Sequence, residues 1–153
     1  MNVNGKVVAV CISESKGMKK RDVGKARLVA DHGIEGDGHA GPGDRQVSLL
    51  ALESIGKMRA AGLDVGPGDF AENLAIEGLD LCSLPIGTLL KVGASAELEI
   101  TKIGKVCHER CAIYFQAGDC VMPREGIFAI VRKGGDVATG DVVEVMASGD
   151  ERR

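Results

Sequence analysis

Short runs of β-branched and apolar residues recur along the chain and are separated by polar, glycine-containing segments. Runs of this length and composition predict buried or half-buried strands. In Ala96–Ile103, Leu98 and Ile100 alternate with Glu97 and Glu99, which is the period of a strand with one face exposed. The predicted strands are Lys6–Ser13, Ala26–Ala30, Val47–Leu50, Asn73–Ile76, Thr88–Val92, Ala96–Ile103, Gly126–Arg132 and Asp141–Met146.

A helical period is visible in one segment, Ala51–Gly62. Leu52, Ile55 and Met58 recur every three residues and would form one apolar face, and Gly62 is a natural helix end. Alanine and aromatic residues in Cys111–Ala117 allow one or two helical turns. The pattern therefore predicts a mainly β, barrel-like domain of short strands with one main helix.

Polar segments between the predicted strands are expected to be loops. Lys16–Lys25 carries five lysines and arginines and predicts a solvated loop, with an anion-binding lip as the alternative. Gly134-Gly135-Asp136 predicts a turn. Glycine is abundant, with 22 residues in a chain of 153, about twice its usual share of roughly 7%. Such a content indicates many tight turns between short strands.

The segment Asp31–Gln46 reads DHGIEGDGHAGPGDRQ and combines turn residues with charged side chains. Its five glycines and one proline exclude a regular helix or a long strand. Loops on a rigid framework often carry function, and His39 and Arg45 could hold an anion or a substrate oxygen. The alternative is a turn-rich surface loop in which aspartates accept hydrogen bonds from backbone N–H groups.

Three of the five cysteines lie in Ile103–Glu125, among basic side chains. Nearby positive charge lowers the pKa of a thiol and makes the thiolate available at neutral pH. Thiolates carry sulfur, attack electrophiles and bind soft metals, whereas an isolated cysteine is more often a small core residue. The segment contains Cys107, His108, Arg110, Cys111, Asp119, Cys120 and Arg124.

Composition narrows the class of protein. The chain is 44% hydrophobic and 27% charged, as in soluble globular domains, and 153 residues suit a single domain. It contains no apolar run of membrane-spanning length and no basic lead-in of a signal peptide, so a cytoplasmic protein with reduced cysteines is expected. A net charge of −3 and the absence of tryptophan argue against nucleic-acid binding.

An ordered series of short motifs covers residues 5–146. They are Gly33–Asp37 with His39, Asp44–Leu49, Pro67–Leu74, Gly78-Leu79, Leu84–Gly87 with Val92-Gly93, and finally Cys107. In this order they resemble the MOSC domain, which is named from the C-terminal domain of molybdenum cofactor sulfurases. The resemblance implies a single β-barrel domain over residues 5–146, followed by a polar tail at residues 147–153.

The resemblance also implies a link to molybdenum cofactor or sulfur chemistry. Cys107 falls on the family's cysteine, which is proposed to carry persulfide sulfur or to ligate molybdenum. His39, Arg45, Arg110 and Arg124 would supply charge, because arginine makes bidentate contacts with a phosphate such as that of the cofactor. The expected partners are molybdenum cofactor biosynthesis proteins or molybdoenzymes.

The type of activity stays open. The protein could be a sulfur transferase, or a component of a molybdenum-dependent oxidoreductase.

Pyridoxal phosphate is not expected, because no residue is marked as a Schiff-base lysine. Two positions differ from the family pattern: Gly38 stands where relatives often have arginine or another larger residue, and Val106 where many have proline.

Two other functions compete with this interpretation. The first is a zinc-binding module formed by Cys107, Cys111 and Cys120 with His108 or Asp119, since four such ligands make a tetrahedral site. Its spacing lacks the paired C-x-x-C pattern of zinc knuckles. The second is a non-catalytic partner domain that docks to cofactor-assembly proteins.

Overall fold

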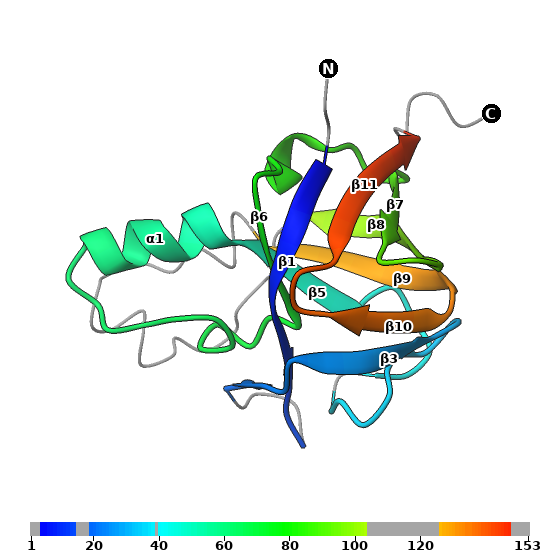
Figure 1. Ribbon diagram of the computed structural model, residues 1–153, viewed down its shortest axis with the longest axis horizontal. Helices are drawn as coiled ribbons and strands as arrows, with labels where there is room; N and C mark the ends of the chain where they lie inside the picture. The colour runs from blue at the N-terminus through cyan, green and yellow to red at the C-terminus, as the bar shows by residue number, and fades with distance from the viewer. Residues whose placement is uncertain (1–3, 15–18, 39, 104–125, 148–153) are drawn as a thin grey trace.

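Seven strands close into a barrel in the computed structural model, which describes residues 4–14, 19–38, 40–103 and 126–147 (Figure 1). Around the barrel the order is β11-β7-β8-β9-β5-β6-β1, and β1 pairs back onto β11. The bounds are β1 Asn4–Ile12, β5 Val47–Ala51, β6 Leu74–Glu77, β7 Leu89–Val92, β8 Ala96–Ile103, β9 Ile127–Lys133 and β11 Val142–Ala147.

Helix α1 (Leu52–Ala60) lies in the connection between β5 and β6. These two strands pair in parallel, and parallel neighbours need a long crossover rather than a hairpin. Figure 1 shows α1 beside the barrel wall. Ile55 and Met58 are buried on its inner side, as the helical period predicted, while Lys57 and Arg59 are exposed.

A smaller three-stranded sheet packs next to the barrel, with β3 (Lys25–Val29) between β10 (Gly135–Ala138) and β4 (Gly33–Ile34). A two-residue strand, β2 (Arg21–Asp22), pairs with the end of β1. A 3-10 turn, η1 (Leu81–Ser83), follows β6. Within the described ranges, no helix is long and apolar enough to cross a membrane.

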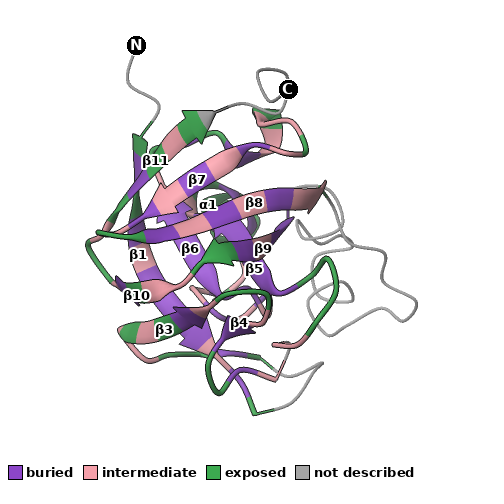
Figure 2. Cartoon of the chain, turned by 90° about the vertical axis from the view of Figure 1, so that its right-hand side faces the viewer, coloured by how far each residue is buried: buried purple, intermediate pink, exposed green. Residues whose placement is uncertain are grey.

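The hydrophobic core has two parts, one on each side of the barrel wall. Along β7 and β8, buried positions alternate with more exposed ones (Figure 2), and Leu98 and Ile100 are fully buried inside the barrel. On β5, Leu49 belongs to this inner cluster, whereas Leu50 packs outward with Ile55 of α1. Helix α1 therefore covers the outer face of the β5 region and gives it a second apolar layer.

One sequence-based expectation about loops holds in part and another was wrong. The segment Lys16–Lys25 was expected to be solvated, and Lys19, Arg21 and Lys25 are exposed. However, β2 pairs with β1 there and Lys20 is buried, because its ammonium group has a buried acidic partner far along the chain. The turn expected at Gly134–Asp136 overlaps β10, which pairs with β3. Glycine suits this strand because a Cβ on Gly135 would lie 2.5 Å from Oγ of Ser95.

Candidate functional site at one end of the barrel

Strands β8 and β9 meet at one end of the barrel, where Ile103 pairs with Ile127. Residues 104–125 join these two strands in the sequence and lie outside the described residues. His39 also lies outside the described residues. The sequence-predicted residues outside the described ranges are therefore His39, Cys107, His108, Arg110, Cys111, Asp119, Cys120 and Arg124, and Arg45 is the predicted cofactor-binding residue whose position is described.

Arg45 lies on the surface of this barrel end. Its guanidinium carbon is 5.3 Å from the centroid of the Phe128 ring, which is a cation–π contact. The hydroxyl of Thr101 on β8 donates to the carbonyl oxygen of Asp44, so the backbone before Arg45 is attached to the β8 wall. Stacking uses the face of a guanidinium group, and its N–H edges are the part that binds phosphate or carboxylate.

Gln46 attaches the C-terminal end of the glycine-rich segment Asp31–Gln46 to the barrel. Its side chain is fully buried, and Nε2 donates to Oδ1 of Asp31 at 3.0 Å and to the carbonyl oxygen of Gly43 at 3.1 Å. Oε1 accepts the backbone N–H of Val131 at 3.0 Å. The amide thus connects both ends of the loop to β9, directly beside Arg45.

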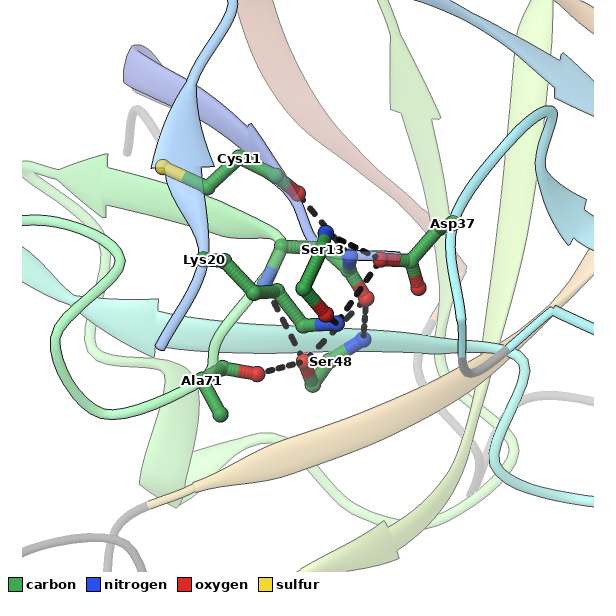
Figure 3. A network of polar contacts seen from close by, with 7 residues as sticks. Cys11, Ser13, Lys20, Asp37, Ser48 and Ala71 are labelled. Atoms are coloured by element: carbon green, nitrogen blue, oxygen red, sulfur yellow. Dashed lines mark hydrogen bonds and ion pairs between the residues drawn. The ribbon is translucent and has the colours of Figure 1, made fainter. Parts of the chain in front are cut away.

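A buried ion pair attaches the beginning of the same loop (Figure 3). Nζ of Lys20 lies 2.7 Å from Oδ1 of Asp37, and neither side chain is exposed. Lys20 also donates to Oγ of Ser13 at 3.1 Å, and the Ser13 N–H donates to Asp37 at 3.1 Å. Burial alone would raise the pKa of Asp37, but the hydrogen bonds from Lys20 and Ser13 outweigh it and hold this pKa below its ordinary value.

A second buried network joins β5, β6 and the end of β1. Oδ1 of Asn73 accepts the Ser48 N–H at 2.9 Å, and its Nδ2 donates to the Cys11 carbonyl oxygen at 3.0 Å. The Ser48 hydroxyl lies 3.3 Å from the carbonyl oxygen of Ala71, a residue with a φ of 63° (Figure 3). The motif Pro67–Leu74 therefore supplies backbone attachment points for the barrel wall.

Glu72 is a fully buried carboxyl group in that motif. It accepts the backbone N–H groups of Gly68 at 2.7 Å and Phe70 at 3.3 Å. Burial raises the pKa of Glu72 to about 7, although these hydrogen bonds favour the ionised form. Burial, followed by the charge of Glu72, raises the pKa of the Cys11 thiol to about 12, so Cys11 is an inert core residue.

A cavity of about 380 Å³ lies between α1 and the turn after β6. Glu53, Lys57, Asp80 and the half-buried Cys82 line it, together with apolar side chains. It contains none of the residues that the sequence indicated as a site. Within the described ranges, no three His, Cys, Asp or Glu side chains form a group that could hold a metal ion.

The sequence belongs to the MOSC domain family, whose model matches residues 35–144. Among solved structures, the YUAD protein from Bacillus subtilis is similar at 21% identity, with 95% of this chain and 97% of that chain covered and a TM-score of 0.78. YiiM from Escherichia coli is 21% identical, with 99% of this chain and 75% of that chain covered and a TM-score of 0.63. YiiM from Geobacillus stearothermophilus is 16% identical, with 94% and 75% covered and a TM-score of 0.69.

At these identities, the solved structures show a shared fold. No curated protein matches the chain significantly. Family membership and the closed barrel confirm the resemblance seen in the sequence motifs and the expected mainly β architecture.

Proposed function

We propose that this protein binds the molybdenum cofactor, or carries sulfur for it, through the thiolate of Cys107. MOSC domains are associated with that cofactor. The observation that carries the proposal is the position of Arg45, an exposed cation held over Phe128 at the barrel end from which residues 104–125 depart. The partners would be molybdenum cofactor biosynthesis proteins or molybdoenzymes.

Chain length supports a shared site for Arg45 and Cys107. Cys107 follows Ile103, the last residue of β8, by four residues, and four residues span at most about 14 Å. Arg45 is attached to the same barrel end, because Thr101 of β8 contacts the backbone of Asp44. We expect Arg45 or His39 within about 10 Å of Cys107, a distance over which charges interact at physiological salt.

The chemistry of these side chains fits the cofactor. The molybdenum cofactor ends in a phosphate, and the guanidinium of Arg45 would bind it in a bidentate manner, with His39, Arg110 and Arg124 as further candidate cations. A thiolate is a suitable ligand for molybdenum, which would supply redox chemistry when bound. Cationic neighbours would keep Cys107 ionised near neutral pH.

Sulfur transfer needs only a donor persulfide. The Cys107 thiolate would attack the outer sulfur of the donor, the donor's S–S bond would break, and a new S–S bond would form on Cys107. The donor leaves as a thiolate, so charge and electrons balance without an external oxidant. Carrier and cofactor-binding roles thus use the same thiolate.

The decisive experiment is elemental analysis with intact mass of protein freshly purified from cells supplied with molybdate and zinc. Bound molybdenum, or a mass gain of one sulfur atom, is expected in the wild type and should be lost in Cys107→Ser. Cys82→Ser is the matched control and should keep the loading. Stoichiometric zinc that depends on Cys107, Cys111 and Cys120 would establish the zinc-binding module instead, and an unloaded wild type would contradict the proposal.

A further inference from the structure

The loop that carries Arg45 is held at both ends by completely buried polar side chains. It leaves β4 after Ile34 and enters β5 at Val47. Between these points the loop contains several glycines, which allow the backbone many conformations. Gly36, Gly41 and Gly43 adopt positive φ values of 86°, 148° and 124°. The described anchors therefore decide where the loop lies.

The first anchor is the Lys20–Asp37 pair. Asp37 is bound from two sides, by Nζ of Lys20 at 2.7 Å and by the Ser13 N–H at 3.1 Å. The next residue continues the attachment, since the Gly38 N–H donates to the Ser13 carbonyl oxygen at 2.8 Å. Lys20 is itself attached to a third segment, because its N–H donates to the carbonyl oxygen of Gly68 at 2.8 Å. The pair thus joins three loops at the end of β1.

The second anchor is Gln46, with its hydrogen bonds to Asp31, Gly43 and Val131. The backbone there is packed so closely that a Cβ on Gly33 would lie 2.5 Å from the Gln46 carbonyl oxygen. Arg45 directly precedes this anchor in the sequence. Its position over Phe128 consequently depends on a loop that is attached to the barrel at both anchors.

A buried ion pair often contributes little net stability to a fold. Desolvation of two charges cancels much of their attraction, and apolar replacements of buried pairs are often neutral or stabilising. Buried polar groups fix one arrangement instead, because any other arrangement leaves a buried charge without its partner. The exposed Arg27–Asp136 pair in the same chain, at 3.6 Å with side chains 64% and 84% exposed, has no such effect.

We propose that Lys20 and Asp37 are positioning residues that hold the loop of residues 34–46 in the conformation in which Arg45 binds the anionic end of the ligand. The binding part of this inference rests on the proposed function. Ordering a flexible cation before binding removes an entropic cost from the complex, so the pair contributes to affinity without touching the ligand.

The test is a double-mutant cycle on the full-length protein, with molybdopterin released from a molybdoenzyme as the probe. Lys20→Met is expected to weaken binding about tenfold in the wild-type background and less than about twofold when Arg45→Met is also present, because coupled residues act non-additively. Asp37→Asn keeps the shape of the side chain and should behave like Lys20→Met. Asp136→Asn, in the exposed pair, is the control and should leave affinity unchanged.

Amide hydrogen exchange in the ligand-free variants provides a readout that does not depend on binding. Exchange at Gly38 and Gly41, whose N–H groups bond Ser13 and His32, should accelerate about tenfold or more in Asp37→Asn. Exchange at Gly93, bonded to Val142 in a distant turn, should accelerate much less than at Gly38 and Gly41, since a loss of global stability would accelerate all three alike.

Four results separate the possible outcomes. Additive effects of Lys20→Met and Arg45→Met, or unchanged exchange at Gly38, would overturn the positioning role. If the wild type does not bind molybdopterin, the proposed function fails and the binding role falls with it. Faster exchange confined to the loop would even then establish Lys20 and Asp37 as the residues that order it.

Discussion

The backbones of Gly68 and Lys20 lie directly against each other. The Lys20 N–H donates to the Gly68 carbonyl oxygen at 2.8 Å, and a Cβ on Gly68 would overlap the Lys20 carbonyl group. Gly68 also has a φ of 92°, a conformation that residues with a side chain rarely adopt. The close contact brings the Pro67–Leu74 motif against the segment that supplies the buried lysine.

Replacing Gly68 with alanine should therefore be far more costly than an ordinary glycine substitution. The left-handed conformation alone costs roughly 1–2 kcal/mol, and the overlap with Lys20 would add a backbone shift, for a total of about 3 kcal/mol or more. Gly36→Ala is the matched control, because Gly36 has a φ of 86° but no atom within 4 Å of the added Cβ. Urea unfolding of both variants measures the difference, and equal losses would contradict the close contact.

Glu72 should make the protein less stable as the pH rises. Its pKa is raised by burial from 4.5 to about 7, so its contribution to stability is complete below pH 4.5 and is lost as the pH rises through 7. Each pKa unit corresponds to about 1.4 kcal/mol. The free energy of unfolding of Glu72→Gln should therefore rise by about 3 kcal/mol relative to that of the wild type between pH 4.5 and 8. Unfolding free energies at several pH values test this.

Lys20→Met should destabilise the fold although it adds apolar surface. Removing one partner of a buried pair typically costs about 3–5 kcal/mol, because the other charge stays buried. Asp136→Asn, which breaks the exposed pair with Arg27, should cost less than about 1 kcal/mol. Thermal and urea unfolding compare the two. A cost for Lys20→Met as small as that of Asp136→Asn would show that the pair is solvated in solution.

The Lys20–Asp37 pair should also make the free energy of unfolding depend on pH in the acidic range. The pKa of Asp37 is held below its ordinary value of 3.8, so its ionised form contributes stability above that pH, and this contribution is lost as the pH falls below it. The stability difference between wild type and Asp37→Asn should therefore shrink in acid. A difference that stays constant from pH 7 to pH 3 would exclude a role for the ionised carboxyl group.

Periodicity predicted most of the barrel because each strand carries its own signal. Ala96–Ile103 alternates from Ala96 to Thr101 and was placed at its observed bounds, and α1 was recognised from the spacing of Ile55 and Met58. The short strands at Arg21–Asp22 and Gly135–Ala138 were missed. Their residues have no apolar pattern, and they are strands only because β1 and β3 offer paired backbone groups.

Site residues could be predicted from the sequence only where a charged side chain lies in an unusual local sequence. Arg45 could be identified from a glycine-rich loop that carries a histidine and an arginine. Lys20 could not, because a lysine among other basic residues looks solvated and its partner Asp37 is 17 residues away. Gln46 and Glu72 were also missed as buried groups, since only tertiary contacts distinguish them from surface residues.

The cysteines should differ widely in reactivity towards an alkylating reagent at pH 7. Cys11 is fully buried and its thiol pKa is raised to about 12, so it should label only when the protein opens. Cys82 is half-buried and should label at an intermediate rate. Cys107, with Lys105, His108 and Arg110 close in the sequence, should label first, because cationic neighbours favour the thiolate.

A short labelling time course with peptide mass spectrometry ranks all five cysteines in one experiment. Denatured protein, in which the thiols become equivalent, serves as the control for peptide recovery. If Cys107 labels no faster than Cys11 in folded, ligand-free protein, the thiolate role loses its physical basis and Cys111 or Cys120 becomes the better candidate. If Cys107 labels first, Cys107→Ser should abolish sulfur or molybdenum loading at unchanged stability, since its thiol would then be a reactive group and not part of the core.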